Sequence, residues 1–218
     1  MKALAPHLGD VEALVFDLDG TLVDTFTDLA ASVNQLRGEF GRGPMTPEAV
    51  KGHVGMGVRH LVESCLEPSD TDELDEVVER FVKHYSAHLL DSTRPYPGVV
   101  EGLTRLGKRP MAVLSNKPQA QTRDIVHRLG LEGFFANVFG GDSFSGLKPD
   151  PVALTGTLAS LSVHPERALM VGDSQVDLQS ARAAGVRIVL VTTGLMTRDA
   201  ALVGGPDGVI DDLRELTP

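Results

Sequence analysis

Hydrophobic positions divide this chain into a helical stretch and a stretch in which short apolar runs alternate with helices. In the first stretch, apolar residues recur at helical spacing over residues 25–40 and 72–90. Two shorter helices are predicted to begin at Thr46-Pro47 and at Val58. No strand pattern falls between residues 24 and 93, so this part of the chain is predicted to be all-helical.

Short continuous apolar runs elsewhere have the character of buried strands. Such runs, bounded by turn signals, are typical of strands that helices cover on both faces. Helical patterns over residues 119–129, 151–161 and 175–184 follow three of them. The predicted strands are residues 13–16, 111–114, 137–139, 168–171 and 186–191.

Strands that alternate with helices indicate an α/β fold, with a parallel sheet and helices on both of its faces. The first predicted strand has the same character as the others, although the helical stretch separates it from them. We therefore expect one α/β core domain made of residues 1–23 and 95–218, interrupted by a helical cap over residues 24–94.

Composition narrows the classes of partner. The 218 residues carry a formal net charge of −10, which disfavours nucleic acid or an anionic membrane as the main partner. An anionic substrate would therefore need local positive charge. Cys65 is the one cysteine, so no intrachain disulfide can form, and no apolar run approaches the roughly 20 residues that span a bilayer. With no signal-peptide pattern at the N-terminus, a cytoplasmic location is predicted.

Polar side chains with catalytic potential follow four of the predicted strands. Open parallel sheets bind ligands at the carboxyl ends of their strands, so these side chains are expected to meet at one edge. In chain order, the strand ends carry Asp17 and Asp19, then Ser115 and Asn116, then Lys148, and finally Asp173, Ser174 and Asp177.

Asp17 and Asp19 are the most informative pair. Strand side chains repeat with a period of two, so the two carboxylates would share a face and repel each other unless a cation, a proton or a reaction partner intervenes. A calcium loop is excluded, because Gly20 comes fourth rather than sixth and no glutamate follows at the required place. The pair therefore indicates a reactive or metal-binding site.

Taken together, these motifs resemble those of the haloacid dehalogenase superfamily of phosphohydrolases over nearly the whole chain. Residues 17–21 are similar to the nucleophile motif, Ser115-Asn116 to the phosphate-binding motif, Lys148 to the family's lysine, and residues 172–177 to the acidic metal motif. The resemblance implies a Rossmann-like parallel sheet with an inserted helical cap. Residues 54–58, 96–98 and 140–142 resemble phosphoglycolate phosphatases in particular.

The resemblance also implies a role for each residue. Asp17 would attack phosphorus and become an aspartyl phosphate, while Asp19 would begin protonated, protonate the leaving oxygen and later activate water. Lys148 would offset negative charge, and Asp177 would hold metal-bound water or Lys148. Mg²⁺ would be bound by the Asp17 and Asp173 side chains and the Asp19 backbone carbonyl. The remaining expected site residues are Gly20, Thr21, Ser115 and Asn116 for substrate and Ser174 in support.

The predicted function is a magnesium-dependent phosphomonoester hydrolase acting on a small phosphorylated metabolite, with 2-phosphoglycolate as the leading substrate. A phosphosugar mutase of the same superfamily and a non-catalytic phospho-ligand-binding module remain alternatives. Dehalogenase activity is disfavoured, because Asp19 supplies an acid that a phosphate ester needs and a haloacid does not. The chain could be a monomer or a homodimer.

Two features of the helical stretch stay open. Met56, Arg59 and His60 are candidates for selecting the substrate, although Arg59 and His60 are equally well explained as a surface pair on a helix. His84 and His88 lie one helical turn apart and could suggest zinc, but a solvated helix face is the favoured explanation because no third ligand is evident.

Overall fold

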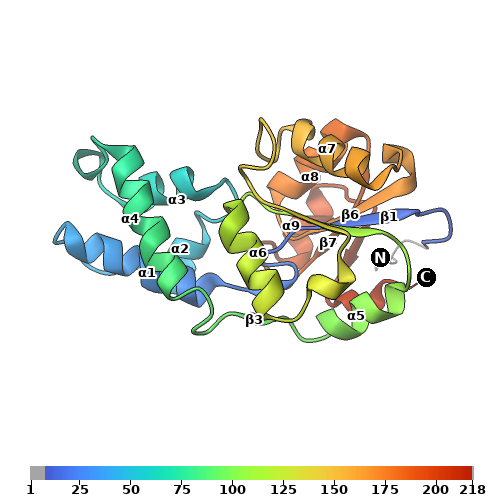
Figure 1. The fold of residues 1–218 in the computed structure, drawn as a ribbon, viewed down its shortest axis with the longest axis horizontal. Coiled ribbons are helices and arrows are strands. Elements are labelled where there is room, and N and C mark those ends of the chain that lie inside the picture. The colour runs from blue at the N-terminus through green and yellow to red at the C-terminus, as the bar shows by residue number, and fades with distance from the viewer. Residues whose placement is uncertain (1–7, 218) are drawn as a thin grey trace.

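A parallel six-stranded sheet forms the core of the protein. The computed structural model describes residues 8–217 and places helices on both faces of the sheet, with a further group of helices to one side (Figure 1). The strand order is β5-β4-β1-β6-β7-β8, and all neighbouring pairs are parallel. This architecture confirms the predicted fold class. The strands are β1 (Ala13–Phe16), β4 (Met111–Leu114), β5 (Asn137–Phe139), β6 (Ala168–Gly172), β7 (Arg187–Val191) and β8 (Gly208–Ile210).

Strand β1 lies inside the sheet because its residues are apolar and fully buried. It pairs with β4 through Leu14 and Met111, and with β6 through Phe16 and Val171. Side chains alternate between the two faces of a strand. Accordingly, Leu14 and Phe16 join one hydrophobic cluster and Val15 joins the other. β1 is third of the six strands, so its carboxyl end lies near the middle of the row of strand ends.

The helices that connect these strands cover the two faces. Buried residues of α5 (Val99–Leu106) and α6 (Gln119–Arg128) belong to the cluster of Leu14 and Phe16. Buried residues of α7 (Pro151–Leu161), α8 (Gln175–Ala184) and α9 (Arg198–Val203) belong to the cluster of Val15. The two clusters make the sheet a buried layer, which explains why its strands read as continuous apolar runs.

The group of helices to one side corresponds to the predicted cap. It contains α1 (Phe26–Glu39), α2 (Pro47–Lys51), α3 (Val58–Cys65) and α4 (Leu74–Ala87) (Figure 1). The chain enters and leaves this group through an antiparallel pair of short strands, β2 (Val23–Asp24) and β3 (Arg94–Pro95). The division into domains at residues 24 and 94 stays a prediction. Both of these residues belong to the strand pair, in which Asp24 lies opposite Arg94.

Several elements were not predicted from the sequence. Strands β2 and β3 are too short for a period-two pattern, and β8 is a three-residue strand. Helix α5 had a usable signal, because its buried residues Val99, Leu103 and Leu106 follow helical spacing. Single 3₁₀ turns complete the described structure at Pro68–Asp70, Glu132–Phe134, Pro165–Arg167 and Leu213–Glu215.

Two smaller expectations can be compared with the structure. No helix within residues 8–217 is long and apolar enough to cross a membrane. Cys65 is a buried free thiol, and burial raises its pKa to about 11. Cys65 is therefore a packed rather than a reactive residue.

Candidate active site

The first pair of aspartates lies where β1 ends. The backbone N–H of Asp17 donates to the carbonyl of Val171 at 2.9 Å, which extends the pairing with β6 by one residue. Gly20 then turns the chain with a φ of 86°, a conformation that side chains rarely adopt. A Cβ at this position would also collide with the Asp173 carboxylate. Glycine is therefore required where this loop passes Asp173.

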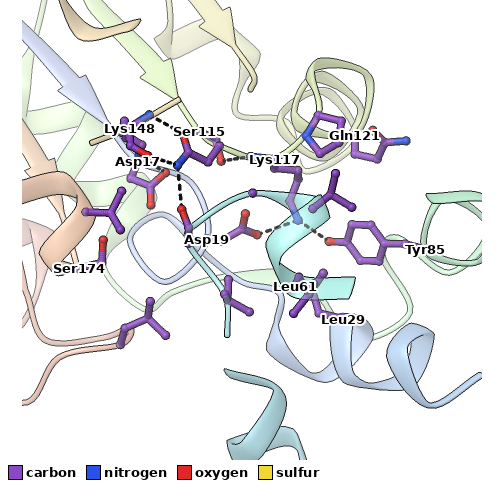
Figure 2. Close-up of a pocket in the computed structure, with 18 of the residues that line it drawn as sticks. Asp17, Asp19, Leu29, Leu61, Tyr85, Ser115, Lys117, Gln121, Lys148 and Ser174 are labelled. Carbon is purple, nitrogen blue, oxygen red and sulfur yellow. Dashed lines mark hydrogen bonds and ion pairs between the residues drawn. The ribbon is translucent and has the colours of Figure 1, made fainter. Parts of the chain in front are cut away.

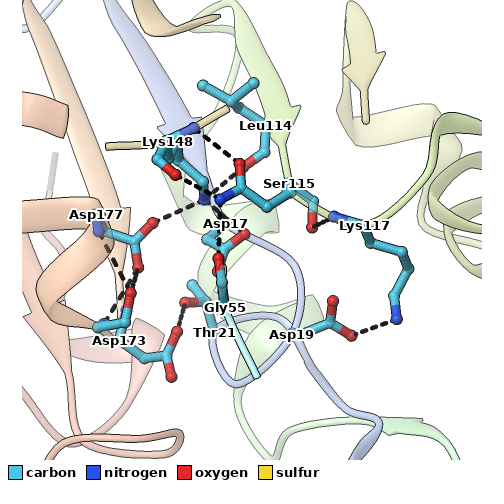
Figure 3. A network of polar contacts seen from close by, with 12 residues as sticks. Asp17, Asp19, Thr21, Gly55, Leu114, Ser115, Lys117, Lys148, Asp173 and Asp177 are labelled. Carbon is cyan, nitrogen blue, oxygen red and sulfur yellow. Dashed lines mark hydrogen bonds and ion pairs between the residues drawn. The ribbon is translucent and has the colours of Figure 1, made fainter. Parts of the chain in front are cut away.

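Lys148 joins two of the predicted acids (Figure 3). Its Nζ lies 2.8 Å from Asp17 Oδ1 and 2.7 Å from Asp177 Oδ1, and it donates to the carbonyl of Leu114 at 2.9 Å. Burial opposes the ammonium charge, but the two carboxylates outweigh it and raise the pKa of Lys148. Lys148 is therefore a permanent cation beside Asp17.

Asp177 holds Lys148 from the start of α8. Ser174 is the N-cap of this helix and accepts from the Asp177 N–H, while Asp177 Oδ2 accepts from the N–H and the hydroxyl of Ser174. This is a capping box, and it orients Asp177 so that its other oxygen faces Lys148. Of the two predicted roles for Asp177, the structure shows the contact with Lys148.

Asp173 is completely buried next to this pair. Its Oδ1 accepts from the Thr21 hydroxyl at 3.1 Å, and its Oδ2 accepts from the backbone N–H of Leu195 at 2.7 Å. The loop that carries Leu195 follows β7, and its neighbour Thr193 donates to the carbonyl of Gly20 at 2.7 Å. This loop was not predicted to reach the site, although it follows a strand end as the other motifs do.

These acids form a cluster that suits a divalent metal ion. Oxygen atoms of Asp17, Asp173 and Asp177 lie within 4.8 Å of one another, and all three residues are buried. Burial raises the pKa of Asp17 to about 7, and burial together with the neighbouring carboxylates raises that of Asp173 well above its usual value. A bound cation would relieve this crowding of negative charge, and a set of carboxylate oxygens is typical of hard divalent ions.

Ser115 and Asn116 reach the same site from the end of β4, and both line its cavity. The Asn116 amide donates to the carbonyls of Lys148 and Gly55 at 2.7 and 2.8 Å, and accepts from the Lys148 N–H at 2.9 Å. These contacts place Asn116 as a brace for Lys148. Substrate binding by Gly20, Thr21, Ser115 and Asn116 stays a prediction.

Asp19 has a partner that the sequence analysis missed. Figure 2 shows Lys117 between Asp19 and Tyr85. Lys117 Nζ lies 3.0 Å from Asp19 Oδ1 and donates to the Tyr85 hydroxyl at 2.9 Å, while the Thr25 hydroxyl donates to Asp19 Oδ1. Lys117 and Thr25 both contact Asp19 Oδ1 and fix the orientation of the Asp19 side chain. That Asp19 begins the reaction protonated stays a prediction. Lys117 could have been predicted as a site residue, because it follows Ser115 at the same strand end. Tyr85 could not, because it is one of the regularly spaced apolar positions of a helix and nothing in the sequence marks it as a site residue.

The predicted specificity candidates are not among the residues that line the cavity, although their neighbours Gly55, Gly57 and Val58 are. Met56 and Arg59 are exposed, and Arg59 forms an ion pair with Asp75. Neither residue lines the cavity, and the same holds for His60. His84 and His88 contact different acids, Glu39 and Asp91.

The chain is similar to known proteins over most of its length. A family model for haloacid dehalogenase-like hydrolases matches residues 14–191. A phosphoglycolate phosphatase of Agrobacterium fabrum is 37% identical over 211 residues, covering 94% of this chain and 90% of that protein. One of Chromobacterium violaceum is 36% identical over 217 residues, covering 96% of each.

A solved structure is also closely similar. The crystal structure of a protein from Haemophilus somnus, described as a predicted phosphoglycolate phosphatase, superposes with a TM-score of 0.87 at 27% identity. The match covers 94% of this chain and 96% of that one. These relatives confirm the prediction of a phosphatase enzyme. With the family model matching most of its length, the chain belongs to the haloacid dehalogenase-like hydrolase family.

Proposed function

We propose that this protein is a Mg²⁺-dependent phosphomonoester hydrolase that acts through an aspartyl phosphate, with 2-phosphoglycolate as its preferred substrate. The observation that carries the proposal is the buried ion pair of Lys148 with Asp17, beside Asp19 at the end of β1. A fixed ammonium next to a carboxylate lets that carboxylate approach a second anion, the phosphate ester. The names of the two curated relatives support the choice of substrate.

In the first half of the reaction, an Asp17 oxygen attacks phosphorus as the ester P–O bond breaks. The leaving alkoxide takes a proton from Asp19, which becomes a carboxylate. The Ser115 hydroxyl can donate to a phosphoryl oxygen, because it lines the same cavity as Asp17. The covalent step divides one difficult displacement into two easier ones.

The second half regenerates the enzyme. A water molecule attacks the phosphorus and gives its proton to Asp19, while the bond between phosphorus and the Asp17 oxygen breaks. Inorganic phosphate and the free Asp17 carboxylate result. Lys117 and Thr25 hold the Asp19 carboxylate in place for this step through the contacts described above.

Mg²⁺ would be held by the side chains of Asp17 and Asp173 and by the backbone carbonyl of Asp19. When bound, it neutralises negative charge on the phosphoryl group and its nucleophile. Asp177 is committed to Lys148 and to the start of α8, so its role would be to position rather than to coordinate.

The proposal predicts phosphate release from 2-phosphoglycolate in the presence of Mg²⁺. A chelator should abolish turnover, and Asp17→Asn should lower it by at least about 1,000-fold because an amide is a poor nucleophile. Colorimetric assay of inorganic phosphate measures both effects. Intact-mass measurement of the wild-type protein during turnover should show a phosphoryl adduct that is absent from Asp17→Asn.

Asp124→Asn is a matched control, because Asp124 is exposed on α6 and pairs with Arg128. Turnover that survives Asp17→Asn would overturn the nucleophile assignment. Rapid hydrolysis of other esters without hydrolysis of 2-phosphoglycolate would overturn the choice of substrate. Interconversion of hexose phosphates without phosphate release would identify a mutase. No turnover of any of these esters would favour a non-catalytic binding module.

A further inference from the structure

The cavity beside Asp19 has an apolar wall that the cap helices supply. Phe81 and Val82 of α4, Val58 and Leu61 of α3, and Leu29 of α1 all line it. Figure 2 labels Leu29 and Leu61 of this set. The leaving group of a substrate held at Asp17 would face this wall, because Asp19 lies between Asp17 and the cap. The hydroxyl groups of a sugar would lose their hydrogen bonds to water against such a surface and would find no hydrogen-bond partner on it. A short leaving group therefore fits better.

Two cationic side chains line this cavity among the described residues, Lys148 and Lys117. Lys148 is bound by Asp17, by Asp177 and by a backbone carbonyl. Lys117 has one carboxylate partner, Asp19, and lies on the cap side of it. It is therefore the cation that an anionic leaving group would meet.

Tyr85 contacts Lys117 through both its hydroxyl group and its ring. Its hydroxyl oxygen accepts from Lys117 Nζ at 2.9 Å, and the ammonium also lies 4.4 Å from the centre of its ring. Burial raises the pKa of Tyr85 to about 12, so the hydroxyl keeps its proton at neutral pH. Because that oxygen accepts from Lys117, the Tyr85 O–H is able to donate to a ligand.

A nearby polar atom also lacks a partner. The Gln121 side chain lines the cavity and donates from Nε2 to the Ser86 hydroxyl, whereas its buried Oε1 has no hydrogen-bond partner among the described residues. Buried polar atoms without partners are uncommon in folded proteins and are typical of places where a ligand or water binds. Because Gln121 Oε1 only accepts, it cannot bind a carboxylate directly, but a water molecule can donate to it and to a neighbouring carboxylate at once.

We propose that Lys117 and Tyr85 form a carboxylate-binding subsite that makes this enzyme selective for short phosphorylated hydroxy acids. The inference rests on the proposed function and deepens it. In 2-phosphoglycolate the carboxylate is joined to the carbon that bears the ester oxygen. Asp19 must reach that oxygen, and Lys117 lies 3.0 Å from Asp19, so the carboxylate would fall within reach of the ammonium. A buried ammonium and a neutral phenol together match the two oxygens of a carboxylate.

The test compares two esters that differ in this group. 2-Phosphoglycolate carries the carboxylate, and 2-hydroxyethyl phosphate carries a hydroxymethyl group in its place. Wild-type enzyme should prefer 2-phosphoglycolate in kcat/KM. Lys117→Met removes the charge and keeps a flexible side chain, and it should reduce that preference by about 100-fold. Tyr85→Phe should reduce it by about tenfold, and Lys117→Arg should retain part of it.

Lys83→Met is a matched control, because Lys83 is exposed on the same helix as Tyr85. Thermal unfolding of each variant checks that it folds, and Tyr85→Phe tests the subsite even if Lys117→Met does not fold. An equal loss for both esters would overturn the proposal, because it would show that Lys117 acts only by positioning Asp19. A preference that survives both substitutions would overturn it as well.

The wild-type enzyme separates this inference from the proposed function. Hydrolysis of both esters at equal rates would leave a phosphatase but overturn the carboxylate subsite. Hydrolysis of neither ester, together with turnover of unrelated phosphates, would overturn the proposed substrate and the subsite together.

Discussion

At the scale of single residues, Asn116 illustrates how a motif residue can serve the site indirectly. Its side chain is predicted to bind substrate, and in the structure it also makes three contacts with the backbone of Lys148 and Gly55. Gly55 belongs to the cap side of the cavity and Lys148 to the core side. Asn116 thus connects the loop that carries Lys148 with the loop that carries Gly55.

Asn116→Ala is expected to destabilise the protein and to slow catalysis. The substitution leaves the buried N–H of Lys148 without an acceptor, which costs about 1–3 kcal/mol. Lys148 would then be held less firmly beside Asp17, so kcat should fall more than KM rises. Urea denaturation and steady-state kinetics measure the two effects. Asn137→Ala, which removes an exposed contact with Ser160, is the control. Unchanged stability would show that these hydrogen bonds contribute nothing in solution.

At the scale of elements, one buried aspartate ties the two ends of the cap together. Asp28, in the first turn of α1, accepts hydrogen bonds from the N–H groups of Ser92 and Thr93 and from the Thr93 hydroxyl. Residues 92 and 93 precede β3, and β3 pairs with β2 just before α1. The strand pair and Asp28 together fix how the helices leave and rejoin the sheet.

Asp28→Ala should loosen this connection. Two backbone N–H groups lose their acceptor, and we expect a loss of about 2 kcal/mol in the free energy of unfolding. Hydrogen exchange measured by mass spectrometry should be faster at residues 92 and 93, while the strands of the sheet should keep their protection. Asp124→Ala, at an exposed ion pair on α6, should change neither quantity. Equal protection of residues 92 and 93 in both variants would contradict the role given to Asp28.

At the scale of the whole molecule, negative charge is concentrated at the buried aspartates of the candidate site. The carboxylates of Asp17, Asp19, Asp173 and Asp177 face two ammonium groups, those of Lys117 and Lys148. The protein as a whole carries −10. A divalent cation at this site would therefore favour the folded state as well as the approach of an anion.

Mg²⁺ should raise the melting temperature of the wild-type protein by about 5 °C at saturating concentration, because it binds the folded chain in preference to the unfolded one. Asp173→Asn should remove most of this shift by removing one charge from the cluster. Differential scanning calorimetry with Mg²⁺, with chelator and with sodium at equal ionic strength measures the effect. A shift of the same size in Asp173→Asn would place the cation elsewhere.

Much of the fold and part of the site could be predicted from the sequence. The predicted strands at residues 13–16, 111–114 and 137–139 agree with β1, β4 and β5. Burial on both faces leaves a local signal in the form of a continuous apolar run. Lys148, Asp173 and Asp177 could be named in advance because they match the family's motifs, and parallel strands gather their carboxyl ends at one edge.

The tertiary structure alone decided which polar groups meet. Lys117 contacts Tyr85 across 32 residues of sequence, and Leu195 contacts Asp173 across 22. These contacts depend on how the cap helices and the loop after β7 pack against the sheet. Apolar periodicity reports only which face of an element is buried, so it gives no information on such partners. The motif of residues 17–21 was therefore visible in the sequence, whereas its contact with Lys117 and Tyr85 came from the packing.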